Sequence, residues 1–253
     1  MKHLKLLSAL AVAALLLGVV ASCKPAPTPT PKPTAPTPTP VPPTPTSVPI
    51  TKITVATDAT WPPAEMIDEE TKEIIGFDID LVNAIGQEAG LEVEFKNVAW
   101  DGIFVGLEAG EYDAICSSVT ILPEREEKYG FSEPYFNAGQ LVVVRIETTD
   151  IKSHEDLSGK TAGAQIGTTG AFEVEKVEGA TLKEYDTIDL AFMDLLEGRI
   201  DAAVADSPVS YGFVAKYPGK LKTVGEPFTD EWYGILVKKG NVELLDLINK
   251  GLA

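Results

Sequence analysis

The chain of 253 residues is poor in several residue types on which common protein functions depend. Its two Cys are too few for a thiolate zinc site or a framework of disulfides. Its two His leave little room for histidine-based catalysis. Basic residues number 21 against 38 acidic ones, which gives a formal net charge of -17. Proteins that bind nucleic acid present basic faces to phosphate, so this charge argues against that class.

The N-terminal residues have the pattern of a secretory signal. Lys2 and Lys5 precede an apolar run, residues 6–21, that contains no charged residue. A transmembrane anchor needs about 20 apolar residues and a stop-transfer flank, which this run lacks. The run ends in Val-Ala-Ser-Cys at residues 20–23, which resembles the lipobox of bacterial lipoproteins. The resemblance implies a signal peptide over 1–22 and a diacylglycerol group on Cys23, and secretion without lipid is the alternative.

Residues 23–50 form a Pro/Thr-rich segment, and 12 of the 19 prolines lie in it. Such a segment cannot bury a core and adopts extended polyproline II. At about 3.1 Å per residue it is a semi-rigid spacer of up to ~80 Å. A cell-wall or glycosylated stalk is the alternative, with the same mechanical effect. We therefore expect a globular part, residues 51–253, that is held away from a membrane surface.

The globular part alternates strand and helix patterns. The first series consists of strands at 53–57, 91–97 and 114–116 and helices at 78–89 and 102–109, with Gly90 and Gly110 ending the helices. The segment 58–63, which contains Trp61, is expected to be a loop because Pro62 and Pro63 disfavour helix, and Trp100 is expected in another loop. This alternation predicts a mostly parallel sheet with helices on both faces.

A second series follows an extended run at 139–145. It consists of strands at 161–164, 181–185 and 202–205 and of helices at 170–176, 187–197 and 207–215, followed by an extended segment at 235–237 and an amphipathic helix at 241–252. We therefore expect two α/β lobes, 51–140 and 141–230, and a return to the first lobe over 231–253. Open α/β sheets bind ligands beyond the carboxyl ends of their strands, so two facing lobes make one cleft.

Arg125 follows one of these strands and stands in the first turn of a short helix. A cation there opposes the helix dipole unless an anion lies beside it. One interpretation is a surface ion pair with Glu124 or Glu126. The other is a guanidinium fork that holds a ligand carboxylate, with the hydroxyls of Ser118 and Thr120 as helpers.

The second series has its own candidates. Residues 167–170, Gly-Thr-Thr-Gly, open a helix whose backbone amides can hold an anion, although Thr168 can equally act as a helix cap. The turn lacks the Lys of a nucleotide P-loop, so phosphate hydrolysis is not expected. Asp206 ends an apolar strand and can either receive an ammonium group or cap the next helix. Trp61 and Trp100 can stack on a flat or cationic group, or can belong to the core.

Longer motifs add a specific resemblance. They are Gly76-Phe-Asp-Ile-Asp-Leu81, Trp100-Asp-Gly-Ile-Phe104, Asp113-Ala-Ile-Cys-Ser-Ser-Val-Thr-Ile-Leu-Pro-Glu-Arg125, Phe131-Ser-Glu-Pro-Tyr135, Leu157-Ser-Gly-Lys160, Gly167-Thr-Thr169 and Gly198-Arg-Ile-Asp-Ala-Ala203. In order, over nearly all of residues 51–253, they resemble the bacterial periplasmic amino-acid-binding proteins of ABC importers. The resemblance implies a type II periplasmic-binding-protein fold, with two α/β lobes joined by two hinge crossings that close on one amino acid.

The resemblance also implies the binding residues, which are Asp58, Trp61, Trp100, Ser118, Thr120, Arg125, Thr169 and Asp206. Arg125 would grip the α-carboxylate with Thr120 and the Thr169 amide. Asp206 and the region of Ser118 would take the α-ammonium. Trp61 and Trp100 would flank the ligand side chain and Asp58 would meet its tip. This favours arginine or lysine first and glutamine next, unless Asp58 is only a turn residue or a hydrogen-bond partner of a neutral amide.

Several further expectations follow. Ala64 stands where the family usually has Phe, which implies a looser pocket floor. The chain stops at Ala253, where relatives usually continue for about another helix, so we expect a C-terminal fragment to be missing. Cys116 has apolar neighbours and is expected to be an inert core residue without a disulfide. The expected partners are a free amino acid, an ABC permease and a membrane reached through the lipid on Cys23. We expect a monomer without cofactor, metal, nucleic acid or catalytic residue.

Two other classes compete with this interpretation. Fold-related dehydratases and cell-wall lyases are enzymes, but His154 is the only His after the predicted signal, and no nucleophile elbow or zinc-ligand spacing is present. The acidic residues are so numerous that pairs of carboxylates carry no information about catalysis. The extracellular part of a sensor needs a transmembrane helix after the domain, and none precedes Ala253.

Overall fold

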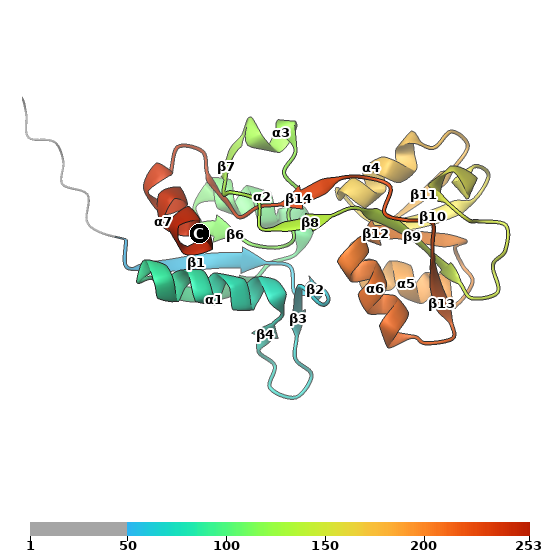
Figure 1. Ribbon diagram of the computed structural model, residues 1–253, viewed down its shortest axis with the longest axis horizontal. Helices are drawn as coiled ribbons and strands as arrows, with labels where there is room; N and C mark the ends of the chain where they lie inside the picture. The colour runs from blue at the N-terminus through green and yellow to red at the C-terminus, as the bar shows by residue number, and fades with distance from the viewer. Residues whose placement is uncertain (1–49) are drawn as a thin grey trace, which may run out of the picture. The chain divides into compact units, whose positions relative to one another are not determined.

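The computed structural model describes residues 50–253, and Figure 1 shows their helices and strands. The predicted signal peptide, the predicted lipidation site at Cys23 and the Pro/Thr-rich segment up to residue 49 lie outside the described residues. From residue 50 onward, no helix combines the length and the apolar character that crossing a membrane requires.

The first lobe is built on a five-stranded sheet with the strand order β5-β1-β6-β15-β7. Its strands are β1 (Lys52–Thr57), β5 (Glu92–Asn97), β6 (Ala114–Ile115), β7 (Tyr129–Phe131) and β15 (Leu236–Lys238). β1 is parallel to β5 and β6, whereas β15 is antiparallel to β6 and β7. The predicted parallel arrangement holds for β5, β1 and β6, and the sheet is mixed because β15 enters from the C-terminal segment in the opposite direction.

Helices cover both faces of this sheet (Figure 1). They are α1 (Phe77–Ala89), α2 (Trp100–Ala109) and α7 (Val242–Leu252), while the short α3 (Pro123–Glu126) precedes β7. Side chains alternate along β1, so Ile53 and Val55 pack with α1 and α7 while Ala56 packs with Ile103 of α2 on the other face. α1 ends, as predicted, at Gly90, whose φ of 73° lies in the left-handed region that glycine adopts without strain.

The second lobe repeats this arrangement with the strand order β11-β10-β12-β9-β13. Its strands are β9 (Gln140–Arg145), β10 (Thr161–Gln165), β11 (Thr181–Tyr185), β12 (Ala202–Asp206) and β13 (Leu221–Val224), and its helices are η1 (His154–Leu157), α4 (Thr169–Lys176), α5 (Ile188–Leu196) and α6 (Ser207–Lys216). β10 is parallel to β11 and β12, and β9 is antiparallel to β12 and β13. Neighbouring residues of β9 face opposite clusters, since Val143 packs with Phe192 and Val142 with Val174.

Two short antiparallel strands connect the lobes. They are β8 (Phe136–Ala138) and β14 (Glu231–Tyr233), which lie side by side between the two sheets in Figure 1. β8 leads into β9 of the second lobe, and β14 leads back into β15 of the first. The two crossings implied by the resemblance are therefore this strand pair.

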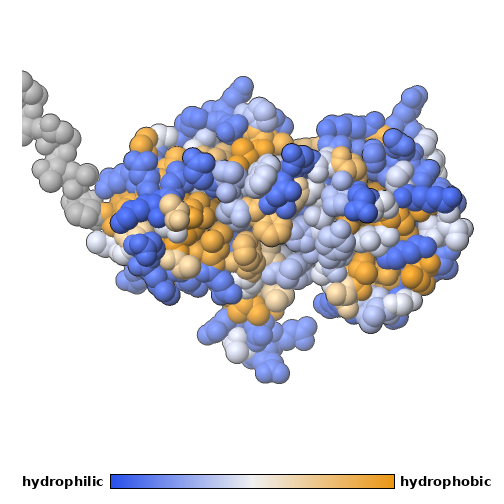
Figure 2. Space-filling model, in the orientation of Figure 1, coloured by the Kyte–Doolittle hydropathy of each residue, from blue (hydrophilic) through white to orange (hydrophobic). Residues whose placement is uncertain are grey.

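A small three-stranded sheet extends from the first lobe. It consists of β2 (Thr60–Trp61), β3 (Glu65–Ile67) and β4 (Ile74–Ile75), and the turn between β3 and β4 is hydrophilic in Figure 2. Gly76 follows with φ 134°, and a Cβ there would lie 2.2 Å from the Ala64 carbonyl oxygen. Only glycine fits this close approach, which brings β3 against the start of α1.

The predicted loop positions of both tryptophans are wrong. Trp61 lies in β2, because the chain after Pro62 and Pro63 turns back and pairs Trp61 with Glu65. Trp100 is the first residue of α2, which begins two residues before the predicted start at Gly102. Glycine in a first helical turn is tolerated, since the N–H groups there have no partner within the helix.

Candidate ligand-binding site between the lobes

A cavity of about 320 Å³ opens between the two lobes. The first lobe lines it with Asp58, Trp61, Trp100, Ser117, Ser118, Thr120 and Arg125, and the second with Gln165, Thr168, Thr169 and Asp206. All eight predicted binding residues are among these, whereas Ser117, Gln165 and Thr168 were not predicted. The cavity lies at strand ends: Asp58 follows β1, Gln165 ends β10 and Asp206 ends β12. This is the position at which open α/β sheets bind ligands.

Arg125 is a half-buried cation at this cavity. Its Nη1 donates to the Thr120 carbonyl oxygen at 3.0 Å, and its Nη2 donates across the lobes to the Gly167 carbonyl oxygen at 3.4 Å. The guanidinium lies 5.6 Å from the Trp100 ring centroid and 5.4 Å from that of Phe104. Burial lowers the pKa of Arg125, while the charge of Asp206 acts in the opposite direction. This side chain is a charged donor directed at the cavity by aromatic packing.

The surface ion pair considered for Arg125 is wrong. None of the ion pairs among residues 50–253 joins Arg125 to Glu124 or Glu126. The guanidinium instead turns toward the second lobe, where a carbonyl oxygen is its partner. Its positive charge is therefore available to an anion inside the cavity.

Asp206 is a buried carboxylate on the opposite lobe. It occupies the residue before α6, but its side chain makes no cap hydrogen bond, so the capping alternative is wrong. Its Oδ1 accepts from Gln140 Nε2 and its Oδ2 from the Tyr233 hydroxyl, and both donors draw the carboxylate away from the helix end. Burial, followed by the charge of Glu231, raises the pKa of Asp206 to about 7. A cationic group in the cavity would therefore stabilise the ionised form of this buried carboxylate.

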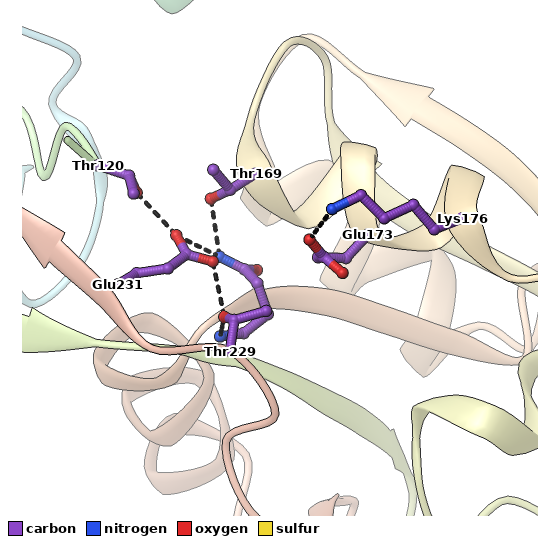
Figure 3. Close-up of polar contacts among 7 residues, drawn as sticks. Thr120, Thr169, Glu173, Lys176, Thr229 and Glu231 are labelled. Atoms are coloured by element: carbon purple, nitrogen blue, oxygen red, sulfur yellow. Dashed lines mark hydrogen bonds and ion pairs between the residues drawn. The ribbon is translucent and has the colours of Figure 1, made fainter. Parts of the chain in front are cut away.

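Glu231 of the crossing strand β14 and Gln140, the first residue of β9, link the lobes through side-chain hydrogen bonds, and Figure 3 shows the one between Glu231 and Thr120. Glu231 Oε2 accepts from Thr120 Oγ1 at 2.8 Å, and its Oε1 accepts from Thr229 Oγ1 at 2.7 Å. Gln140 Nε2 donates to Thr169 Oγ1 at 2.9 Å and also approaches Glu231 Oε2 at 3.4 Å. Neither residue was predicted, because no local pattern distinguishes them from other polar residues beside an apolar strand.

Asp58 forms a second acidic position in the cavity. It is 3% exposed, and burial raises its pKa. Its Oδ1 accepts from Thr60 Oγ1 at 2.8 Å and its Oδ2 accepts from Gln165 Nε2 at 2.9 Å. Its N–H donates to Ser117 Oγ at 2.9 Å. Gln165 was missed because the strand was predicted to end at Ala164, and the rule that ligands meet strand ends would have found it with a strand one residue longer.

The N-terminus of α4 faces the cavity from the second lobe. Thr168 Oγ1 accepts from the Ala171 N–H at 3.4 Å and donates to the Gln165 carbonyl oxygen at 2.8 Å, which confirms the capping alternative for Thr168. Thr169 is the first residue of the helix, and its N–H belongs to the group of amides that lack partners within the helix. Such amides favour an anion.

Trp61 crosses from the first lobe to the second. It is 6% exposed and packs with Ile188 and Phe192 of α5, so the core interpretation applies to much of its ring. Its indole N–H is buried without a partner and its side chain lines the cavity. Trp61 therefore offers a free donor as well as an aromatic surface.

Two other expectations concern residues near the cavity. Ala64 does not line it but lies in a neighbouring apolar hollow of about 460 Å³ beside Phe77 and Phe136, so its small size does not loosen the predicted pocket floor.

Cys116 is free and fully buried, and burial raises the pKa of its thiol well above the usual range, as expected of an inert core residue. Within residues 50–253 no cluster of His, Cys, Asp and Glu side chains has the arrangement of a metal site.

Comparisons with known proteins agree with this geometry. The L-cystine-binding protein TcyJ of Escherichia coli (strain K12) is 32% identical over 203 residues, which cover 79% of this chain and 76% of that protein. The ABC transporter arginine-binding protein 1 of Escherichia coli (strain K12) is 35% identical over 209 residues, which cover 80% and 84% of the two chains. The arginine-bound structure of truncated ArgBP from T. maritima is 40% identical, with a TM-score of 0.76 over 79% of this chain and 94% of that one.

These matches confirm the predicted type II periplasmic-binding-protein fold. The matched proteins bind solutes for transport, in agreement with the expectation that the chain is not an enzyme. The model of one family, described as bacterial extracellular solute-binding proteins, family 3, matches residues 53–253. The chain therefore belongs to family 3 of the bacterial extracellular solute-binding proteins.

Proposed function

We propose that the chain captures a free amino acid with a basic side chain, arginine or lysine, and delivers it to an ABC permease. The observation that carries the proposal is one cavity that contains Arg125 from the first lobe and the acids Asp58 and Asp206. A basic amino acid has one anionic and two cationic groups, so this cavity offers each of them a partner of opposite charge. Two of the similar proteins are named as arginine-binding, which supports the same class.

Arg125 is assigned to the α-carboxylate. A guanidinium presents parallel donors that match the two oxygens of a carboxylate, and Arg125 has aromatic packing that holds its direction. The hydroxyl of Thr120 and the free N–H of Thr169 lie on the same cavity. The Arg125 guanidinium and the Thr169 N–H are donors from the two lobes and favour closure when a carboxylate is present, whereas the Thr120 hydroxyl would join them only by turning away from Glu231.

Asp206 is assigned to the α-ammonium, with Ser118 beside it on the cavity wall. Burial and the charge of Glu231 raise the pKa of Asp206 to about 7. An ammonium group beside Asp206 would compensate the negative charge of its buried carboxylate. Gln140 and Tyr233 already satisfy part of the carboxylate and fix its direction. These two neutral donors leave the negative charge of Asp206 without a cation, and the ammonium group of a free amino acid supplies one.

Asp58 is assigned to the tip of the ligand side chain, with Trp61 and Trp100 beside the ligand. A guanidinium or ammonium tip would pair with the buried carboxylate of Asp58 and lie against an aromatic face. The α-amino acid groups and the side-chain tip would thus use separate acids, Asp206 and Asp58.

Glutamine is the second candidate ligand. In the structure an amide already donates to Asp58, since Gln165 Nε2 lies 2.9 Å from Asp58 Oδ2. A ligand amide has the same chemistry and would take the same acceptor. It would lack the charge of a guanidinium, so we expect it to bind more weakly than arginine.

We further propose that a lipid on Cys23 anchors the chain to the membrane and that one monomer serves one permease. The family is extracellular, which agrees with a lipid on the outer side of a membrane. Mass spectrometry of the membrane fraction tests the anchor. A diacylglycerol-modified N-terminal Cys23 supports it, and an unmodified N-terminus in the soluble fraction contradicts it.

Isothermal titration calorimetry with each of the twenty amino acids tests the ligand class. We expect arginine or lysine to bind with a micromolar or smaller dissociation constant and glutamine to bind less tightly. Tight binding of glutamine without binding of arginine or lysine would favour the second candidate. Failure of every amino acid to bind would contradict the proposal.

A further inference from the structure

Two carboxyl groups lie fully buried beneath the first-lobe side of the cavity, and the roles proposed above use neither. Glu65 is in β3 and Asp78 in the first turn of α1, and both residues are 0% exposed. They meet because the Asp78 N–H donates to the carbonyl oxygen of Ala64, the residue before Glu65, at 3.0 Å. No ion pair among residues 50–253 includes either carboxyl. Two such charges cannot be buried side by side without compensation.

Hydrogen bonds from neighbouring groups reach three of the four carboxyl oxygens. Asp78 Oδ2 accepts from the Ser118 N–H at 2.8 Å and from the Tyr135 hydroxyl at 2.7 Å. Glu65 Oε1 accepts from the Ser117 hydroxyl at 3.0 Å, and its Oε2 accepts from the Ser118 hydroxyl at 3.4 Å. Asp78 Oδ1 is buried without such a donor. Both carboxyls converge on Ser118, whose N–H donates to Asp78 and whose hydroxyl donates to Glu65, and two carboxyls placed together can hydrogen-bond each other only when one carries a proton.

Asp78 is the better placed of the two to keep a negative charge. It accepts a backbone N–H and lies in the first turn of α1, where the helix dipole favours an anion. Glu65 accepts only from hydroxyls, and burial together with the charge of Asp78 holds its pKa well above the usual range. The other titratable groups that face the pair are Asp58, Cys116, Tyr135 and Tyr233. None of these four supplies a positive charge.

The pair also holds part of the cavity wall in an unusual backbone conformation. Ser118 has φ 49°, a value that a residue other than glycine keeps only where its neighbours enforce it. Its N–H donates to Asp78 and its hydroxyl to Glu65. The Ser117 hydroxyl donates to Glu65 and accepts from the Asp58 N–H at 2.9 Å. The two acids therefore hold Ser117 and Ser118 directly, and they hold the Asp58 N–H through the Ser117 hydroxyl.

We propose that Glu65 stays protonated at neutral pH and donates a hydrogen bond to Asp78 Oδ1. This acid–carboxylate pair positions the Ser117–Ser118 segment, and through it Asp58, for the ligand. The positioning role rests on the function proposed above, whereas the shared proton does not. Loss of the proton at alkaline pH leaves two adjacent buried carboxylates, whose repulsion displaces the segment and weakens ligand binding. Glu65 and Asp78 are positioning residues, since neither lines the cavity.

Infrared spectroscopy of the ligand-free protein tests the proton. At about pH 8, where exposed carboxyls are ionised, we expect the C=O stretch of a protonated carboxylic acid, and Glu65→Gln removes it. Asp206→Asn is the matched control and leaves this band in place, because Asp206, with a pKa of about 7, is mostly ionised at that pH. The readout needs no ligand. The absence of a protonated-acid band that depends on Glu65 would overturn the shared proton.

Calorimetry with arginine tests the positioning role. Glu65→Gln keeps a donor for Asp78 Oδ1, so we expect its affinity to stay within about threefold of the unaltered protein and to lose the decline at alkaline pH. Glu65→Leu has a similar volume but no donor or acceptor, so we expect binding at least about tenfold weaker. Thermal unfolding verifies that each variant is folded.

Two outcomes would overturn the positioning role. One is unchanged arginine affinity in a folded Glu65→Leu variant. The other, which applies even if that variant does not fold, is the same decline at alkaline pH in Glu65→Gln as in the unaltered protein. A protein that shows the Glu65-dependent infrared band but binds no amino acid would instead contradict the function proposed above.

Discussion

The two lobes share one sheet plan but hold their cavity residues by different means. In each sheet three strands run parallel and are followed by an antiparallel strand and a fifth strand at the edge, with β1 and β10 in equivalent positions. Behind the cavity the first lobe has the buried acids Glu65 and Asp78, whereas the buried acid of the second lobe, Asp206, lines the cavity itself. The scaffold determines where strands end, and the residues just beyond those ends determine the chemistry.

The difference extends to the cavity residues. The first lobe contributes the cation Arg125, the acid Asp58 and both tryptophans. The second contributes Asp206, Gln165 and the capped start of α4. If this division is functional, changes in the first lobe should abolish capture or alter selectivity, and changes in the second should weaken capture of every amino acid.

The largest expected effect concerns the cation of the first lobe. Arg125→Ala should weaken binding of every amino acid at least about 100-fold, because the ligand carboxylate would lose charged hydrogen bonds in a partly buried site. Calorimetry measures the loss. Arg199→Ala is the matched control, since Arg199 forms an exposed ion pair with Asp194 in the second lobe, and its affinity should not change. An affinity for arginine within tenfold of normal in Arg125→Ala would contradict the assignment.

The carboxylate of the second lobe should have the next largest effect. Asp206→Asn keeps the shape and one acceptor but removes the charge that the ligand ammonium would meet, so binding should weaken about 30-fold. The loss should be similar for arginine, lysine and glutamine, because all three carry the same α-ammonium. Calorimetry with the three ligands measures the three losses of affinity. A loss restricted to one ligand would refute the assignment of Asp206 to the α-ammonium.

Acidity should weaken binding through the same carboxylate. In the ligand-free protein the pKa of Asp206 is raised to about 7 by burial, and an ammonium group favours the ionised form. Above pH 7 the carboxylate is ready to pair, whereas below pH 7 a proton must first leave, so affinity should fall about tenfold per pH unit. Titrations at several pH values, with Asp206→Asn as the control, test this. A profile that stays flat in the unaltered protein, or is equally steep in Asp206→Asn, would contradict it.

The smallest of these effects should be selective. Asp58→Asn retains an acceptor and removes a charge, so binding of arginine and lysine should weaken about fivefold while binding of glutamine changes less. The measurement is the ratio of the arginine and glutamine dissociation constants in the two proteins. An equal loss for all three ligands would mean that Asp58 only supports the fold of the loop.

Elements with a long, regular pattern were predictable from the sequence, and the strands of the crossings were not. The strand Thr181–Tyr185 has the predicted bounds, and α1 ends at the predicted glycine. β8 and β14 have three residues each, and the residues that pair lie more than 90 positions apart in the sequence. Strands this short show no periodic pattern from which they could be predicted. Glu231 was missed because it belongs to β14, whereas Gln140 begins β9, whose extended run was predicted without any sign that its first side chain would reach Glu231.

The cavity itself was largely predictable, because strand ends and family motifs both point to it. The buried acids beneath it were not. In a chain with 38 acidic residues, no local pattern separates Glu65 from carboxylates on the surface, and the motif that contains Asp78 indicates a family but not the burial of that side chain. Their burial depends on contacts between β3, the start of α1 and the Ser117–Ser118 segment, which only the folded chain brings together.

The account depends most on the claim that Arg125 of the first lobe holds the carboxylate of an amino acid while Asp206 of the second holds its ammonium group. Calorimetry with arginine and two analogues tests this most directly: agmatine lacks the carboxylate, and Nα-acetylarginine lacks the ammonium group. Arginine should bind tightly, and each analogue should bind at least about 100-fold more weakly, because each leaves one buried charge of the cavity without its partner. Agmatine or Nα-acetylarginine binding as tightly as arginine would contradict the account.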